Sequence, residues 1–413
     1  MPSISIIHEH IPLALRGPTL VSPETRLPRY WATVWSSMEG AGLAHNTLRQ
    51  KLTAIDSLYL CAQRQFGEDV LDTLLAKMDF TRIESLMTGR FVELQNEALQ
   101  KSVDNRKTWA SCYAFVSSIL ERLSTVEGDI SELNRLRTSL LRLDRQFKSL
   151  HPGPRRTRPM ALRSLPSTVI EDIYEIIQPS SPRNPFRTEE LQWRNFCLIL
   201  LLLHQGLRRG EALLLLVDSL KSGTHPTTGK RVNWLNVTQS EAQDTRNANR
   251  PSIKTRYAHR QIPVSEEIAQ VWHHFVDNFR TRKRHPYLFS NTRGEPLSGV
   301  APGRILKSVS DRLVPKALEA LKDGLQAKTI RTHDLRHTCA VIRLSQFKET
   351  CISDDEVYEK LRAFFGWSYS SEMPRHYARA YFESRLAAVW HDDFDANVEL
   401  LRNIAPPLRM DIA

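Results

Sequence analysis

The chain is organised around the stretch Thr332-His333-Asp334-Leu335-Arg336-His337-Thr338. His333 and Arg336 are three residues apart in this stretch, so on a helix they would face the same way, one turn apart. Thr332 can cap such a helix, which leaves free backbone N–H groups and the positive end of the helix dipole beside both side chains. A helix start that presents an imidazole and a guanidinium is suited to holding a phosphate. The same pair is also typical of ordinary exposed helix surface, so its meaning depends on partners elsewhere in the chain.

The composition limits the class of protein. The 413 residues are enough for two or three domains with their own cores, and 41% hydrophobic with 25% charged residues is ordinary for a soluble globular protein. The formal net charge of +11 favours an anionic partner, with nucleic acid first and an anionic membrane surface second.

Cysteine usage and the N-terminus bear on the compartment. The five cysteines form no CxxC pair, which argues against a disulfide framework and a structural zinc site and favours a reduced compartment. Residues 1–15 lack the basic region and long apolar run of a signal peptide, and the longest apolar stretch, 197–204, is too short to span a bilayer. We therefore expect a cytoplasmic protein.

The first third of the chain has a helical pattern. Residues 1–28 mix proline with short apolar pieces and no clear period, which predicts an irregular arm. In residues 46–60 the apolar side chains share one helix face, and further helical segments follow up to residue 150. This predicts an all-α domain over residues 29–150, with helices near 46–60, 68–78, 82–99, 106–123 and 130–148.

A basic segment separates this part from the rest. Residues 151–166 hold four prolines, four arginines and no acidic residue. Because proline and glycine interrupt helices and strands, this segment is the best domain boundary in the chain. It is either a simple spacer or a tether that lies along a phosphate backbone.

The remainder combines helices with a few short strands, which predicts a mainly α fold with a small antiparallel β-sheet in a domain over residues 167–391. Arg208 and Glu211, three residues apart, begin a very apolar helix, where an arginine needs a specific reason. Lys254 lies near a small predicted hairpin. The helices are predicted at 167–178, 189–204, 207–216, 265–280, 299–321, 333–346 and 354–365, and the strands at 231–237, 252–255, 260–264 and from 286.

Several of these pieces occur in a telling order. The segment Gly206-Leu207-Arg208-Arg209-Gly210-Glu211 comes first, then Lys254, the His333–Thr338 motif, Gly366-Trp367, and finally Tyr377. Over about residues 165–389 this order resembles the catalytic domain of the tyrosine recombinases, the phage-integrase family. Residues 46–65 resemble the helical core-binding, DNA-binding domain of that family.

The resemblance implies a site-specific DNA recombinase. Such an enzyme cleaves and rejoins DNA through a covalent 3′-phosphotyrosyl intermediate, in the integration, excision or resolution of a mobile element. The catalytic residues it implies are Arg208, Lys254, His333, Arg336, Trp367 and the nucleophile Tyr377, with Glu211 and His337 in support.

The chemistry of these side chains is suited to the cleavage of a phosphodiester. Two guanidiniums, here Arg208 and Arg336, can clamp the non-bridging oxygens of a phosphodiester and its transition state. Glu211 would orient these basic groups rather than act chemically. A phenol is a poor nucleophile until its proton is removed, and His333 is the candidate for that proton.

Three further positions have roles implied by the resemblance. Lys254 is the implied general acid for the leaving 5′-oxygen. Trp367 stands where most relatives have a second histidine; its indole N–H can donate to a phosphate oxygen but cannot transfer a proton. His337 matches the family motif, and we favour a structural role for it.

The spacing of the tyrosine departs from the family pattern. Tyr377 is ten residues after Trp367, whereas the family usually places its tyrosine nine residues after this position, which implies a one-residue insertion. Tyr381, one helical turn further on, is the alternative nucleophile, or a core aromatic residue. Tyr369 comes too early.

The implied partners follow from the same resemblance. We expect double-stranded DNA with a specific recombination site, gripped in a two-domain clamp, and a homotetramer in the synaptic complex. Accessory DNA-bending proteins are compatible with this scheme, and no membrane is involved. Residues 392–413 could link subunits or pack on their own domain. Since the bond energy stays in the covalent link, neither ATP nor a metal or other cofactor is required, and the protein would be nucleoid-associated when bound to DNA.

Two other functions use related sequences. A type IB topoisomerase has similar chemistry but relaxes supercoils as a monomer. The sequences of the two motifs, residues 206–211 and 333–338, favour the recombinase. A non-catalytic, sequence-specific DNA-binding relative would be expected to have lost part of the set, whereas every position is filled here.

Overall fold

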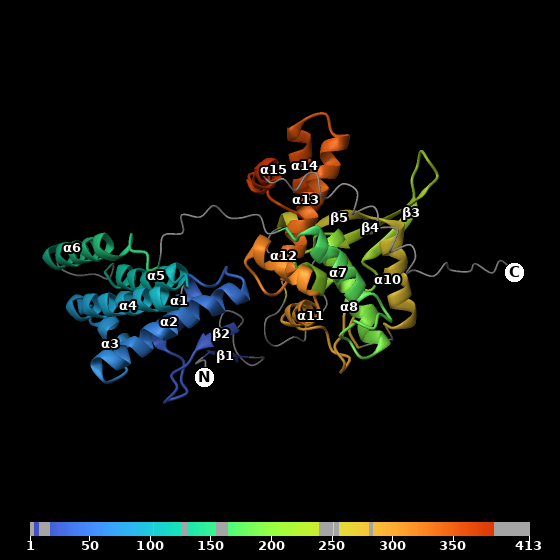
Figure 1. Cartoon of the computed structure of the whole chain (residues 1–413). Helices are drawn as coiled ribbons and strands as arrows, with labels where there is room; N and C mark the ends of the chain where they lie inside the picture. The colour runs from blue at the N-terminus through green and yellow to red at the C-terminus, as the bar shows by residue number, and fades with distance from the viewer. Residues whose placement is uncertain are drawn as a thin grey trace. The chain divides into compact units, whose positions relative to one another are not determined.

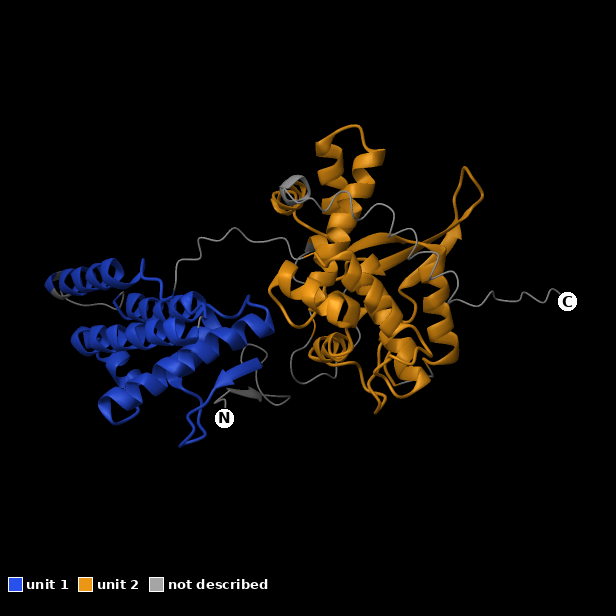
Figure 2. Ribbon diagram, viewed as in Figure 1, with its two compact units in different colours: residues 1–158 blue, residues 159–413 orange. Residues whose placement is uncertain are grey.

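The computed structural model of the chain (Figure 1) describes residues 4–7, 17–101, 103–124, 130–153, 164–238, 251, 256–280 and 284–383. The chain divides into two compact units, residues 1–158 and 159–413 (Figure 2). Each unit has a hydrophobic core of its own, as a chain of this length allows. None of the helices in the described ranges is both long and apolar enough to cross a membrane.

The N-terminal unit is a bundle of helices. The predicted stripe of α2 (His45–Phe66) is buried at Leu52, Ile55 and Tyr59, where the helix packs against α4 (Phe80–Lys101) and α5 (Arg106–Leu123). Apolar residues that recur on one helix face are thus removed from water on one side only. The other helices of this unit are α1 (Tyr30–Met38), α3 (Leu71–Ala76) and α6 (Ile130–Phe147).

The N-terminal arm differs from the expectation of an irregular segment. Strand β1 (Ile4–Ile7) pairs antiparallel with β2 (Gly17–Leu20). Thr19 and Leu20 of β2 are buried, and the strand packs against α1 and α2. Four residues per strand are too few to show an alternating period, so the pairing could not be recognised in the sequence.

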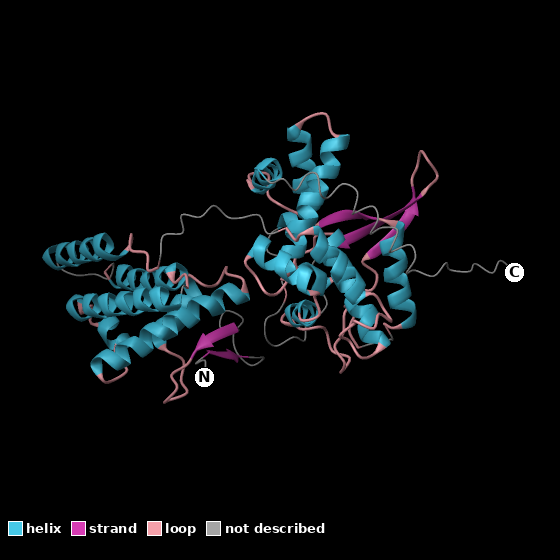
Figure 3. Ribbon diagram, viewed as in Figure 1, coloured by secondary structure: helices cyan, strands magenta, loops and turns pink. Residues whose placement is uncertain are grey.

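The C-terminal unit contains a three-stranded antiparallel sheet in the order β3-β4-β5 (Figure 3). β4 (Arg231–Val237) and β5 (Arg260–Val264) confirm two predicted strands, and β4 buries alternate residues. The third strand, β3 (Leu220–Thr224), was not predicted, because it is short and polar and has only its first residue buried. Residues 256–258, between the predicted strands 252–255 and 260–264, form a short 3-10 helix. The predicted strand at 252–255 lies outside the described residues.

Helices make up the rest of this unit. The apolar helix α8 (Glu189–His204) is buried almost all round and packs against α13 (Thr332–Thr350) and α10 (Glu266–Asn278). The single helix predicted over 299–321 is two helices, because Pro315 has no N–H to continue the first and instead begins the second. The remaining helices are α7 (Ser167–Ile177), α9 (Arg209–Leu214), α11 (Ala301–Ser310), α12 (Pro315–Leu325), α14 (Asp354–Phe365) and α15 (Met373–Glu383).

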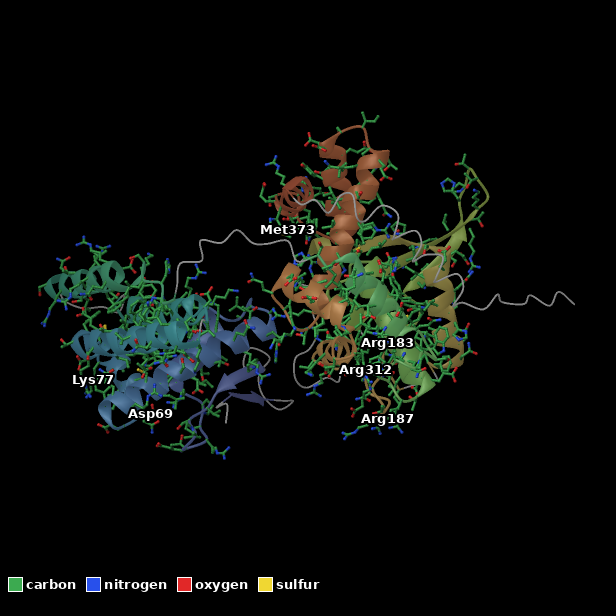
Figure 4. All side chains as sticks on the ribbon, viewed as in Figure 1. Asp69, Lys77, Arg183, Arg187, Arg312 and Met373 are labelled. Atoms are coloured by element: carbon green, nitrogen blue, oxygen red, sulfur yellow. The ribbon has the colours of Figure 1, made fainter. Side chains whose placement is uncertain are left out.

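A buried acid fastens α7 to the start of α12. The Asp172 carboxylate accepts the Val314 N–H at 2.7 Å and pairs with Arg183 at 2.6 Å. Arg183 also donates to the carbonyl of Arg312 at 2.9 Å (both arginines are labelled in Figure 4). This network ties α7 to the residues that lead into α12.

Helix α13 carries the sequence motif and begins with an unexpected cap. Its N-cap is Arg331, whose backbone N–H donates to Asp334 Oδ2 at 2.8 Å, and Thr332 is the first helical residue. The expectation that Thr332 caps the helix is therefore wrong. An acid at the third helical position reaches back to the cap, which satisfies an otherwise unpaired N–H and suits the positive end of the dipole.

Candidate active site

Arg208 stands at the junction of α8 and α9. Gly206, in the left-handed region at φ 56°, turns the chain after α8, and Arg208 is the N-cap of α9. The Arg208 backbone N–H donates to Glu211 Oε2 at 2.9 Å, and its Nη1 donates to Oε1 at 2.6 Å. The spacing of three residues thus places arginine and acid together, with 23% of the Arg208 side chain still exposed.

Glu211 is the common partner of three arginines. Besides Arg208, the Arg260 Nη2 lies 3.0 Å and the Arg336 Nη1 lies 3.8 Å from its Oε2. Burial alone would raise the pKa of the Glu211 carboxyl, but the positive charges of Arg260, Arg336 and Arg208 lower this pKa to about 2. Glu211 is therefore ionised, and it collects guanidiniums that would otherwise repel one another.

The same three arginines bind the C-terminal end of α14. Arg260 Nε donates to the Phe364 carbonyl at 2.7 Å, Arg336 Nη2 to that of Phe365 at 2.7 Å, and Arg208 Nη2 to that of Gly366 at 3.4 Å. The last carbonyls of a helix have no partner within it and carry the negative end of its dipole, so cations are favoured there.

Gly366 makes this approach possible. It is the C-cap of α14 with φ 61°, a conformation that favours glycine. A Cβ at this position would lie 2.9 Å from Arg260 Nη1 and 2.9 Å from the Ala258 Cα. Any side chain here would displace the arginine or the backbone at Ala258, just before β5.

Arg336 is almost fully buried, with 3% of the residue exposed. Its Nη1 also donates to the carbonyl of Gly206, which ties α13 to the turn before Arg208. Burial lowers the pKa of Arg336 to about 9, Arg208 adds to this decrease, and Glu211 opposes it. At neutral pH the guanidinium keeps its charge.

Arg260 was not singled out in the sequence. It is the first residue of β5, and its side chain is buried to 6% exposure with three hydrogen-bond partners, Glu211, Phe364 and Ala258. One signal could have revealed it: Arg260 is in phase with the buried Ile262 and Val264, so a charge occupies the apolar face of a strand.

An aromatic stack adjoins the arginines. The rings of Phe365 and Trp367 are 4.8 Å apart at 18°, and those of Trp367 and Tyr377 are 5.6 Å apart at 13°. The Arg336 guanidinium lies 4.9 Å from the Phe365 ring centre and 5.8 Å from that of Trp367. Trp367 therefore fixes the plane of the Tyr377 ring.

Tyr377 lies on α15 and is only 1% exposed. Its hydroxyl is hydrogen-bonded to His337 Nδ1. Burial raises the pKa of the Tyr377 phenol, and the nearby charge of Arg336 opposes the increase. The phenol is therefore neutral in this arrangement.

The structure brings most of the predicted residues into one cluster. Glu211, Arg336, Trp367, Tyr377 and His337 are connected with Arg208 by the contacts described above. His333 is exposed at the start of α13, with its ring 5.7 Å from that of His337. Lys254 lies outside the described residues, and so does the side chain of the alternative nucleophile, Tyr381.

Comparison with known proteins identifies the class. The model of the phage integrase family matches residues 163–384, which is more than half of the chain. The chain belongs to the phage integrase family. This membership supports, in general terms, a site-specific recombination enzyme of the tyrosine-recombinase type.

Comparison with solved structures finds two recombinases among its matches. The crystal structure of XerA recombinase has a TM-score of 0.33 and 13% identity, covering 91% of this chain and 98% of that chain. A second match is the crystal structure of XerH site-specific recombinase bound to difH substrate, a pre-cleavage complex. It has a TM-score of 0.36 and 15% identity, and the match covers 90% of this chain and 92% of that chain. The comparison with curated proteins finds no match.

Proposed function

We propose that this chain is a site-specific DNA recombinase that cleaves and rejoins DNA through a covalent 3′-phosphotyrosyl intermediate, in the integration, excision or resolution of a mobile element. The observation that carries the proposal is the sharing of one carboxylate, Glu211, by three arginines beside a tyrosine. Among the described residues this set has two more guanidiniums than carboxylates, and such an excess of positive charge is suited to a phosphodiester and to the further negative charge of its transition state.

In this scheme Arg208 and Arg336 hold the non-bridging oxygens of the scissile phosphate. Arg208 has the more exposed side chain of the two, while Arg336 is fixed by two backbone carbonyls and Glu211. Because these partners pre-position the guanidiniums, little reorganisation is needed when charge develops in the transition state.

Tyr377 is the nucleophile of the proposed reaction. Its oxygen attacks the scissile phosphorus while a histidine of α13 accepts the phenolic proton, the bond to the 5′-oxygen breaks, and Lys254 gives the leaving oxygen its proton. His333 and Trp367 complete the set: His333 is an imidazole at an exposed helix start and Trp367 offers an indole N–H.

Rejoining reverses these steps. The free 5′-hydroxyl of a partner strand attacks the phosphotyrosine, so the bond energy is conserved and no nucleotide cofactor is consumed.

Double-stranded DNA with a specific site is the proposed partner, and the net charge of +11 supports an anionic one. We further propose that the residue 29–150 helices and the catalytic domain grip the duplex together, and that the active assembly is a homotetramer on two sites. Residues 392–413, one candidate for the link between subunits, lie outside the described residues.

A suicide substrate tests the proposal. Genomic DNA that stays bound to the purified protein after shearing is sequenced, and the enriched fragment is made with a nick beside the scissile phosphate, so that the cleaved strand diffuses away. We expect wild-type protein to form a DNA adduct stable in denaturing gels and Tyr377→Phe to form none. An adduct with Tyr377→Phe would show that the nucleophile is wrong, and the absence of any adduct with the wild type on a verified site would refute the enzyme. Exchange of strands between two sites, rather than relaxation of supercoils alone, separates a recombinase from a topoisomerase.

A further inference from the structure

We propose that His337 is the catalytic residue that takes the phenolic proton of Tyr377 and returns it when the tyrosine leaves. The inference rests on the proposed function, because it assigns a step within that same site. It also gives the two histidines of α13 different roles: His337 accepts the phenolic proton, and His333 contacts the phosphate.

The contact between the two side chains is direct. His337 Nδ1 is hydrogen-bonded to the Tyr377 hydroxyl, and the two rings lie 5.6 Å apart at 49°. The packing of α15 against α13 makes this contact, which joins residues 40 positions apart. A base must lie within hydrogen-bond reach of the proton it removes, and His337 meets this condition without any movement.

The surroundings hold the phenol in place. Trp367 stacks on one face of the Tyr377 ring at 5.6 Å, which restricts the direction in which the hydroxyl can point. Ala378, the next residue, is also buried, and α15 packs against α13 and α14, so the helix that carries the tyrosine is anchored. A neutral imidazole with its proton on Nε2 accepts at Nδ1, and this tautomer matches the observed pairing.

The chemistry also calls for a base at this position. A tyrosine phenol has an ordinary pKa near ~10 and is a weak nucleophile while protonated. Burial of Tyr377 raises that pKa further, whereas the positive charge of Arg336 favours the phenolate. Removal of the proton by His337 as the oxygen attacks leaves a phenolate beside a guanidinium and an imidazolium, which both stabilise it.

Protons and bonds balance in both directions. During cleavage the phenolic proton moves to His337 Nδ1, the bond from Tyr377 Oη to phosphorus forms, and the bond to the 5′-oxygen breaks with a proton from the separate general acid. During rejoining the 5′-hydroxyl attacks and gives its proton back to that acid. The phenolate then leaves and recovers its proton from His337.

The test separates proton transfer from simple positioning. The side-chain oxygen of His337→Asn lies near the place of Nδ1 and still accepts a hydrogen bond, but it cannot carry the proton. His376→Asn is the matched control, because the His376 ring also lies close to Tyr377, at 5.8 Å. The rate of adduct formation is measured in a single turnover on the suicide substrate, after thermal unfolding and DNA binding have shown that each variant is folded.

We expect His337→Asn to form the adduct about 10²-fold more slowly, and His376→Asn to remain close to wild type. Replacing Tyr377 by difluorotyrosine, whose phenol is more acidic, should restore much of the lost rate in His337→Asn, because the step no longer needs a strong base. A wild-type rate in folded His337→Asn would overturn the inference, and so would a slow rate that difluorotyrosine does not raise.

These failures differ from a failure of the proposed function. If wild-type protein forms an adduct through Tyr377 while His337→Asn forms it equally fast, only the role of His337 is wrong. If the wild type forms no adduct on a verified site, the recombinase itself is wrong, and the inference falls with it.

Discussion

The buried arginines of the N-terminal unit and those of the C-terminal site differ in how their charge is matched. In residues 1–158, Arg29 pairs with Asp69 at 2.5 Å, and Arg90 pairs with Glu93 at 2.8 Å. Glu93 also binds the exposed Arg64 through its second oxygen, so each of the two buried guanidiniums has a carboxylate within contact. The two buried guanidiniums are thus each offset by a carboxylate, while the charge of Arg64, whose side chain is 61% exposed, is screened by water.

In the C-terminal site, the ratio of guanidiniums to carboxylates is higher. Arg208, Arg260 and Arg336 form their ion pairs, among the described residues, with Glu211, so within this set the guanidiniums outnumber the carboxylate by two. Other N–H groups of these arginines donate to neutral carbonyls at the end of α14 and at Gly206.

The difference indicates a role for the excess positive charge in the C-terminal site. Neutral carbonyls satisfy hydrogen bonds without cancelling charge, so a net positive field remains where like charges are crowded together. An arrangement of this kind is unfavourable for the fold alone and becomes favourable when an anion binds. Charge matching in the N-terminal unit serves stability, and we interpret the mismatch in the C-terminal unit as preparation for a phosphate.

The largest effect is expected for Arg336. Arg336→Lys keeps one positive charge but cannot reach the carbonyls of Gly206 and Phe365 and a phosphate oxygen together. We expect the rate of adduct formation on the suicide substrate to fall about 10²- to 10³-fold, with DNA binding changed far less. A rate within about tenfold of wild type would show that charge alone is sufficient there.

The next effect concerns the shared acid. The pKa of Glu211 is lowered from its ordinary 4.5 to about 2, so its stabilisation is fully present above pH 4.5 and is lost as the pH falls toward 2. Glu211→Gln should therefore lower the free energy of unfolding by about 3 kcal/mol at pH 7 and by much less near pH 2. Urea unfolding at several pH values measures this, and an equal loss at both ends would contradict a charge effect.

A buried histidine near the site should make the C-terminal unit sensitive to mild acid. His204 is bonded to Tyr174 in the core, and burial, with a contribution from Arg343, lowers its pKa from 6.5 to about 3. Stability present above pH 6.5 is then lost as the pH falls toward 3, at about 1.4 kcal/mol per pH unit, or about 2 kcal/mol at pH 5.

The control for this effect replaces both partners with apolar residues. The double variant Tyr174→Phe, His204→Leu removes both partners of this hydrogen bond together and should flatten the dependence of unfolding on pH between 6.5 and 5. An unchanged slope in that variant would assign the acid sensitivity to other groups.

The smallest effect is expected in the charge-matched unit. Asp69→Asn removes one charge from the pair with Arg29, which keeps its contact over the Tyr59 ring at 4.0 Å. Since 25% of the Asp69 side chain is exposed, we expect a loss of about 1 kcal/mol in stability. The rate of adduct formation on a saturating substrate should not change, and a large loss of rate would break the comparison between the two units.

Local patterns in the sequence predicted the helices well and the strands less well. The stripe of α2 follows from periodicity, because this helix meets the core with one face, and the continuous apolar run of α8 fits a helix that is buried almost all round. The pair Arg208 and Glu211 also follows from spacing, since three residues make one helical turn. The strands β1, β2 and β3 were missed, because they are short and gain their stability from pairing partners rather than from their own residues.

The sequence by itself determined the helices, the family and the set of residue types that the proposed chemistry needs. Only the tertiary structure decided which of them meet. Arg260 joins Glu211 across 49 residues, and His337 joins Tyr377 across 40. No local period encodes such contacts, because they arise when separate helices and strands pack on a common core and bring their side chains to the same end of α14.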